Sequence, residues 1–270
     1  MIPRMLQLLV FVLLVGTWGL GEAVEPLTLY DNFEKGPINP DKWFGTQFNP
    51  GNTGPYEAAR TIIQDPEGRH LRLLNRSYGQ IGSNSGRSLS FFRLAFSNPS
   101  PITTIRARIQ VLSFKSTGCP NNLLDATSVD ARIFGFFFNS GVGDVIAEVG
   151  VQRSSDSADQ PGVLRIVYFV FQCQDVDCLS NTLLNTGTLG TVTTGQWVKL
   201  LVRWDKDGNQ FIFQRGNQSP VPVSYGNLPD DAPPGIQFKS LDAANFSANC
   251  DVAPRPVGMV DALFDDVSVN

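Results

Sequence analysis

The sequence predicts an all-β fold, built as an antiparallel β-sandwich of two sheets, and three observations support that prediction. Strand-like segments recur roughly every 10–20 residues, with Gly, Pro, Asn and Asp turns between them. No helical apolar period of useful length occurs beyond the N-terminus. The aromatic residues are dominated by 19 Phe, against 5 Tyr and 4 Trp, and Phe favours strands and thick sandwich cores.

The N-terminal stretch has the pattern of a secretory signal peptide. Arg4 supplies a positive start, Leu6 to Val15 is a short apolar run, and Gly21-Glu22-Ala23 is a small-x-small cleavage site. A membrane anchor is the alternative, but the run is shorter than the about 20 residues that a span needs. We therefore expect a signal peptide at 1–23, no membrane span after cleavage, and a single β-sandwich domain at 24–270. The protein would be secreted, in a periplasm or outside the cell.

The remaining strands are justified by apolar alternation between turn signals. Ile105, Ala107, Ile109 and Val111 share one face of a long strand. Turns such as Asp65-Pro66-Glu67-Gly68 separate neighbouring strands. Trp43 follows a Pro-rich loop, and we expect it to plug one end of the core. Strands are expected at residues 27–33, 60–64, 70–75, 90–96, 102–114, 163–173, 196–205, 210–215 and 259–269.

Residues 131–153 are expected to form the central hairpin. Its first arm, Ile133 to Phe138, is apolar on both faces, and a glycine-rich turn follows at Asn139 to Gly143. In the second arm four residues, Val145, Ala147, Val149 and Val151, point one way; Asp144, Glu148 and Gln152 point the other. By contrast, residues 216–257 carry seven prolines and little pattern, which predicts a long meandering connection.

Four cysteines in an exported chain suggest two disulfides, for which three pairings are possible. Cys173 and Cys178 flank a predicted tight turn, so we expect them to pair with each other. That leaves Cys119 to pair with Cys250. A zinc site is the weaker alternative, because the spacings do not suit one and His70 is the only histidine.

The charge balance argues against one class of partner. The net charge is −4 and the isoelectric point is near 5.0, and no cluster of Lys and Arg is present. Nucleic acid needs such a cluster, so we expect no nucleic-acid partner. Nothing in the charge pattern points to an anionic membrane surface either.

The two ends of the mature chain resemble a known superfamily. The opening YDNFEKGPINPDKW is similar to the start of bacterial concanavalin A-like lectin/glucanase domains, and the ending VDALFDDVSVN resembles their closing strand. The WDKDGN hairpin is similar to turns common there. The resemblance implies a jelly roll with its first and last strands side by side. It covers hydrolases, lyases, lectins and inert modules alike, so no single activity follows from it.

Catalysis would need carboxylates at a suitable spacing. Glucanases of this superfamily carry E-x-D-x-(x)-E on a concave strand, and Asp144 and Glu148 occupy a similar place here. Residues i and i+4 of a strand lie about 13 Å apart, whereas catalytic pairs lie roughly 5–9.5 Å apart. Glu148 would therefore need a carboxylate from another strand. Lyase motifs are absent apart from the fragment Gln80-Ile81-Gly82. His70 is expected to be a surface or capping residue and not the general base of a lyase. A tyrosine could serve as that base instead, so lyase activity stays open.

Two further kinds of site are possible. A concave sheet lined by planar polar side chains would suit sugar hydroxyls, with Tyr168 or Trp197 beside them; the alternative is a solvated face with cross-strand ion pairs. The resemblance also implies a structural Ca²⁺ between the first and last strands, and the alternative is solvated surface turns. The candidate ligand-binding residues are Arg106, Arg108, Glu148, Gln152 and Arg165. The candidate calcium ligands are Asp31, Asp265 and Asp266.

From the sequence we expect a secreted module that binds a glycan, such as a polysaccharide, or another extracellular ligand without turnover. Two alternatives stay open. One is a diverged polysaccharide hydrolase or lyase acting near Glu148. The other is a structural envelope protein.

Overall fold

The computed structural model describes residues 26–44, 52–136, 144–175, 178, 180–226, 228 and 238–270. The predicted signal peptide and the glycine-rich turn at 139–143 lie outside these ranges. Within them every regular element is a strand, and no helix is long and apolar enough to cross a membrane. The strands are β1 (Thr28–Asp31), β2 (Trp43–Phe44), β3 (Tyr56–Asp65), β4 (Gly68–Tyr78), β5 (Arg87–Phe96), β6 (Thr104–Ser116), β7 (Ser128–Phe136), β8 (Val145–Ser154), β9 (Val163–Cys173), β10 (Asn181–Thr193), β11 (Trp197–Asp205), β12 (Gln210–Arg215), β13 (Val221–Ser224), β14 (Lys239–Ala248) and β15 (Val257–Val269).

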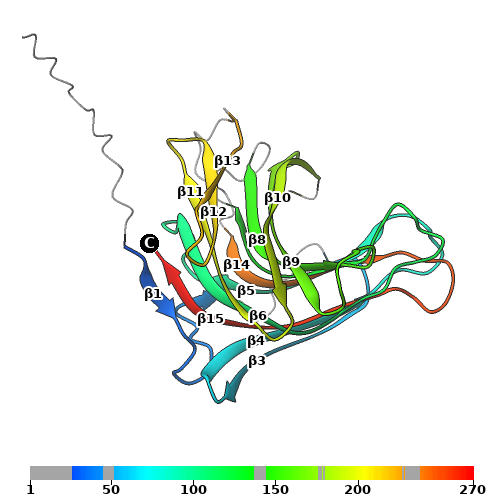
Figure 1. Ribbon diagram of the computed structural model, residues 1–270, viewed down its shortest axis with the longest axis horizontal. Helices are drawn as coiled ribbons and strands as arrows, with labels where there is room; N and C mark the ends of the chain where they lie inside the picture. Colours follow the sequence, from blue (N-terminus) through cyan, green and yellow to red (C-terminus); the bar gives the residue numbers. More distant parts are fainter. Residues whose placement is uncertain are drawn as a thin grey trace, which may run out of the picture.

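The strands form two antiparallel sheets, as the sequence predicted. Sheet A has the order β13-β12-β11-β6-β15-β4-β3, and β1 also pairs with β15. Sheet B has the order β10-β9-β8-β7-β14-β5-β2. The first and last strands do lie side by side, with Thr28 opposite Val269. Figure 1 shows β1 and β15 together at one end of the molecule, and the loops after β4, β6 and β14 at the other.

The core lies between the sheets and is filled by every second residue of the strands. Ile105 and Ile109 of β6 and Phe211 and Phe213 of β12 come from sheet A, and all are fully buried. Trp43 closes one end of this core, as predicted. Its ring lies 4.7 Å from that of Phe96, between centroids.

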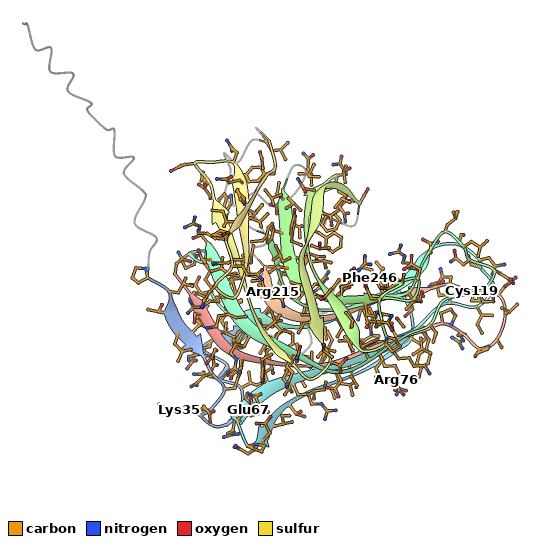
Figure 2. All side chains as sticks on the ribbon, viewed as in Figure 1. Lys35, Glu67, Arg76, Cys119, Arg215 and Phe246 are labelled. Atoms are coloured by element: carbon orange, nitrogen blue, oxygen red, sulfur yellow. A yellow bond between two sulfur atoms is a disulfide. The ribbon has the colours of Figure 1, made fainter. Side chains whose placement is uncertain are left out.

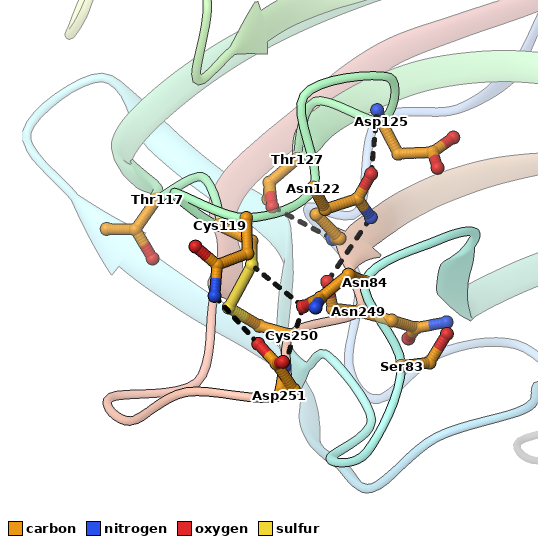
Figure 3. The surroundings of a disulfide bond; sticks show 12 residues. Ser83, Asn84, Thr117, Cys119, Asn122, Asp125, Thr127, Asn249, Cys250 and Asp251 are labelled. Carbon is orange, nitrogen blue, oxygen red and sulfur yellow. Dashed lines mark hydrogen bonds between the residues drawn. A yellow bond between two sulfur atoms is a disulfide. The ribbon is translucent and has the colours of Figure 1, made fainter.

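Both predicted disulfides are present. Cys119 is joined to Cys250 across 131 residues, and Cys173 to Cys178 across five. The first bond ties the loop before β7 to the loop after β14. Figure 3 shows how amide side chains such as Asn122 and Asn84 surround it.

The expectation for residues 216–257 was wrong in its most important part. Residues 239–248 form β14, which lies between β5 and β7 near the centre of sheet B. The segment 181–193 forms β10, at the edge of sheet B, and was not predicted as a strand. Elsewhere the predicted strands match, with β9 and β12 at the expected bounds.

Candidate functional site

The outward face of sheet B is the side turned away from sheet A. In β8, Val145, Ala147 and Val149 belong to the core between the sheets. Because side chains alternate along a strand, Asp144 and Glu148 point to the outward face, as the sequence predicted. Both are nevertheless buried rather than exposed: Asp144 is 0% exposed and Glu148 is 6% exposed.

A row of charged side chains crosses this face on three neighbouring strands. Arg93 of β5, Asp242 of β14 and Arg132 of β7 lie directly opposite one another in the sheet register. Oδ2 of Asp242 accepts hydrogen bonds from Nε and Nη2 of Arg132, at 3.1 and 3.0 Å. It also lies 3.5 Å from Nε of Arg93. One carboxylate therefore joins two guanidinium groups.

Glu148 extends the row to a fourth strand. Its Oε2 accepts a hydrogen bond of 2.5 Å from Nη1 of Arg132. The residue opposite Arg132 on β8 is Gly150. A Cβ at Gly150 would lie 2.4 Å from the Cβ of Arg132 and 2.7 Å from the carbonyl oxygen of Ala131, so a larger residue would clash with β7 at this point. We refer to Arg93, Asp242, Arg132 and Glu148 as the charged row.

A carboxylate of another strand, Asp242, does lie near Glu148: the two bind the same guanidinium, that of Arg132. The sequence offered no signal for it, because Asp242 lies in the segment expected to be a loop. Asp144 accepts a hydrogen bond from its neighbouring backbone N–H, that of Val145, at 2.7 Å.

Burial sets the protonation of the groups in and beside the row. Burial raises the pKa of Glu148, although Arg132 opposes the shift. Burial also raises the pKa of Asp130, which lies two residues before Arg132 on β7, to about 7. Burial lowers the pKa of Arg93 to about 10. For Arg132 burial is outweighed by Glu148 and Asp242, which raise its pKa, so this guanidinium stays charged.

Several oxygens on this face have no protein partner. Within the described residues, Oδ1 of Asp242, Oδ2 of Asp130 and Oγ of Ser240 are buried and accept no hydrogen bond. Buried polar atoms are normally satisfied, and an unsatisfied one costs free energy. These atoms are closed off from solvent, so they belong to the buried layer beneath the accessible side chains of this face.

Aromatic rings lie beside the charged row and at its β9 end. Phe91 and Phe246, on the row's own strands β5 and β14, pack edge to face with centroids 5.6 Å apart. On β9, where Phe169 lies opposite Glu148 in register, Phe169 and Phe171 stack at 5.7 Å. All four are half-buried. Phe134 covers the Arg132 guanidinium at 4.8 Å from its centroid.

The five predicted ligand-binding residues do not share one face. Glu148, Gln152 and Arg165 lie on the outward face of sheet B, where Gln152 pairs in register with Arg165. Arg106 and Arg108 belong to β6 of sheet A. Their side chains lie on the outward face of that sheet, on the opposite side of the sandwich. Arg165 forms an exposed ion pair with Asp159, at 2.6 Å. No single groove holds the whole set.

The outward face of sheet A carries a second cluster, around His70. Its Nε2 lies 3.1 Å from Asp65, and its Nδ1 lies 3.3 Å from Asp265 without hydrogen-bond geometry. The Arg108 guanidinium lies 3.6 Å from Asp265 and stacks 4.5 Å from the centroid of Trp197. His70 is 1% exposed. The expectation of a surface or capping histidine was therefore wrong.

The three predicted calcium ligands already have protein partners. Asp31 accepts hydrogen bonds from the backbone N–H of Phe33, at 2.9 Å, and from Nε1 of Trp43, at 2.7 Å. Arg108 lies within 3.6 Å of both Asp265 and Asp266. In the part of the chain that is described, no three His, Cys, Asp or Glu side chains are arranged to hold a metal ion. Ca²⁺ takes about six to eight oxygens, from backbone carbonyls and water as well as carboxylates, and calcium binding stays a prediction based on the resemblance.

Comparisons with known proteins give structural likenesses only. No family model and no curated protein matches the chain. Solved structures do match, among them a glycoside hydrolase family 16 endo-glucanase from Bacteroides ovatus. It is 13% identical, covers 89% of this chain and 98% of its own, and has a TM-score of 0.47. A glycoside hydrolase family protein from Mycobacterium thermorestibile is 14% identical, covers 88% and 97%, and has a TM-score of 0.44. Carbohydrate-binding module CBM66 from Bacillus subtilis is 10% identical, covers 80% and 95%, and has a TM-score of 0.35.

At identities of 10–14% these likenesses concern the fold alone, and they show no family for this chain. Since every one of these TM-scores lies below 0.5, the activities of those proteins carry no argument about this one.

Proposed function

We propose that the chain is a secreted module that binds a glycan on the outward face of sheet B, without turnover. One observation carries the proposal: on the outward face of β8 and β9, the accessible polar side chains of Gln152 and Arg165 lie beside half-buried phenylalanine rings. Sugars present hydroxyl donors at their edges and apolar C–H groups on their ring faces. Polar side chains such as Gln152 suit the first, and rings such as Phe169 suit the second.

The hydrogen bonds of the charged row would make such a site rigid. Arg132 is bonded on both sides, to Glu148 and to Asp242. A preorganised site loses little conformational entropy when a ligand binds. The two disulfides fit an oxidising compartment, which supports secretion.

A diverged hydrolase or lyase is the second candidate, and one observation favours it. Burial raises the pKa of Glu148, and a raised pKa is what a carboxylic acid needs to donate a proton near neutral pH. The second carboxylate would be Asp242. Since Arg132 binds both, it would hold their relative position.

Glycan arrays followed by calorimetry on the purified protein test binding. We expect Phe169→Ala and Gln152→Ala each to weaken binding about tenfold, a loss typical of a contact worth more than about 1 kcal/mol. Matched controls are Leu201→Ala and Gln214→Ala, which lie half-buried on sheet A. Equal losses in both pairs would contradict the assignment of the face.

Reducing-sugar and unsaturated-product assays separate binding from catalysis. No turnover, with binding retained in Glu148→Gln, supports a binding module. Turnover that Glu148→Gln abolishes would replace the first proposal by the second. Neither binding nor turnover across a broad glycan panel would favour a structural envelope protein.

A further inference from the structure

We propose that the disulfide-bonded end of the sandwich inserts an apolar tip into the surface of a lipid bilayer. The apolar tip consists of Ile81, Leu123, Leu124 and Val252. Leu123 is 88% exposed and Leu124 92% exposed, with Ile81 at 65% and Val252 at 39%. Large apolar side chains presented together in this way commonly mark an interaction surface.

The four side chains belong to three loops that are bonded to one another. The disulfide between Cys119 and Cys250 joins two of the loops, and the backbone N–H of Cys250 donates to the carbonyl of Gln80 in the third. The side-chain amide of Asn122 donates to the carbonyls of Gly86 and Asn249, each at 3.2 Å. Figures 2 and 3 show these loops at the end that carries Cys119, away from β1.

Hydrogen bonds also hold the loops directly beside the exposed leucines. The residue before Leu123 is Asn122, and the residue after Leu124 is Asp125, whose Oδ2 accepts from the backbone N–H of Gly86 at 2.7 Å. Near Val252, the Asp251 carboxylate accepts from Asn121 at 3.0 Å. The leucines are therefore presented by a fixed frame, so their exposure is a property of the fold.

The area of the tip disfavours a protein partner, including a second copy of this chain. The exposed surface of these four residues amounts to roughly 500 Å², while each partner in a stable complex buries about 800 Å² of its surface. Protein interfaces also depend on aromatic and arginine anchors. The loops 79–86, 117–127 and 249–256 contain no aromatic residue, and Arg255 is their only arginine.

The composition of the loops suits a bilayer instead. Residues 79–86 and 117–124 contain no charged side chain, while Asp125, Asp251 and Arg255 border the apolar tip. A shallow insertion of Ile81, Leu123 and Leu124 leaves these three charged groups at the level of the headgroups, in contact with water. Transfer of aliphatic side chains from water into an apolar phase lowers the free energy, and it does so without a surface of matching shape. The net charge of −4 gives no attraction to anionic lipid, so the proposed surface is a zwitterionic one.

Co-sedimentation with phosphatidylcholine vesicles tests the proposal on the purified secreted protein, with its N-terminus confirmed by mass spectrometry. We expect the native protein to bind, with little effect of added salt, because apolar burial drives the binding. The Leu123→Ser/Leu124→Ser double variant should bind at least about tenfold more weakly. Leu183→Ser, at a 48% exposed leucine on β10, is the matched control and should bind as the native protein does.

A second readout places the tip in the lipid. We expect the fluorescence of Leu124→Trp to be quenched by brominated phosphatidylcholine, more strongly than the native tryptophans of the parent protein. Absence of binding by the native protein would overturn the proposal, and so would equal binding by the double variant. A dimer in light scattering that the double variant abolishes would assign the tip to a second copy. Glycan binding should be the same in the double variant, so the two proposals fail separately.

Discussion

Replacing Arg132 by methionine should destabilise the protein strongly, because this guanidinium holds two buried carboxylates. The Arg132 side chain is 4% exposed, and those of Glu148 and Asp242 are 8% and 0% exposed. Methionine would fill much of the same volume without charge or donors. Removing one partner of a buried ion pair costs about 3–5 kcal/mol, since the remaining charge stays buried and uncompensated. We expect a loss in this range for Arg132→Met.

The reasoning is checked by removing the orphaned charge as well. In Arg132→Met, Asp242 keeps its ion pair with Arg93, whereas Glu148 loses its guanidinium partner. We therefore expect the double variant Arg132→Met/Glu148→Gln, in which Glu148 carries no charge, to be more stable than Arg132→Met alone by about 1 kcal/mol or more. Arg132→Lys should fall between the native protein and Arg132→Met, because one ammonium group keeps the charge but not the fork of donors.

Equilibrium urea unfolding, followed by circular dichroism, measures these differences. A loss below about 1 kcal/mol for Arg132→Met would show that the charged row contributes little to the fold. A double variant less stable than Arg132→Met would show that the Glu148 carboxylate has another buried partner.

Three further predictions concern single features of the same structure. The raised pKa of Asp130, about 7 in the fold against about 3.9 unfolded, means that the folded state retains a proton that the unfolded state releases. Its contribution to stability is therefore present at low pH and lost as pH rises through about 7. We expect about 2 kcal/mol less stability near pH 8.5 than near pH 5.5, reduced in Asp130→Asn. Gly150→Ala should lose about 1–3 kcal/mol by crowding Arg132, with Gly118→Ala, whose nearest contact is a hydroxyl at 3.2 Å, as the milder control. Replacing both Cys119 and Cys250 by serine should cost about 4–5 kcal/mol, more than loss of the five-residue disulfide at 173–178, since loop-closure entropy grows with loop length; equal costs in thermal or urea unfolding would contradict this.

The sequence predicted the strands that follow the simple rules of a sandwich. β9 and β12 alternate apolar residues between clear turn signals, and both have the expected bounds. β10 was missed because it is an edge strand with little to bury. Of its 13 residues, NTLLNTGTLGTVT, only Val192 is buried. Such a strand is specified by its partner β9 and carries almost no apolar pattern of its own.

β14 was missed for the opposite reason, because it is buried on both faces but largely polar. Its sequence KSLDAANFSA places Asp242 and Ser240 on one face and Asn245 on the other, and all three are fully buried. Their partners lie far away in sequence: Asp242 binds Arg132, 110 residues distant, and Asn245 donates to the carbonyl of Asn75, 170 residues distant. Polar residues of this kind look like a loop until the sheet brings their partners together.

The same long-range pairing explains why the sequence predicted only some of the residues on the candidate face. Glu148 and Gln152 were placed on the correct face because alternation within one strand is a local property. Arg106 and Arg108 were grouped with them because nothing local says which sheet β6 joins. The carboxylate that Glu148 needed was expected on another strand, but its identity depends on the order β5-β14-β7-β8, which only the fold determines.

β14 also explains how the outward face of sheet B is held in position. Asn245 on its inner face is bonded to Asn75 of β4, in the facing sheet. The side-chain amide of Asn75 in turn donates to the carbonyl of Ala243, again on β14, at 2.8 Å. One residue from Ala243 along the same strand, Asp242 points outward and joins Arg93 and Arg132. Since consecutive residues of a strand move together, the charged row is anchored to the opposite sheet through a single strand. The charged row behind the candidate site is therefore held in position by the sandwich itself.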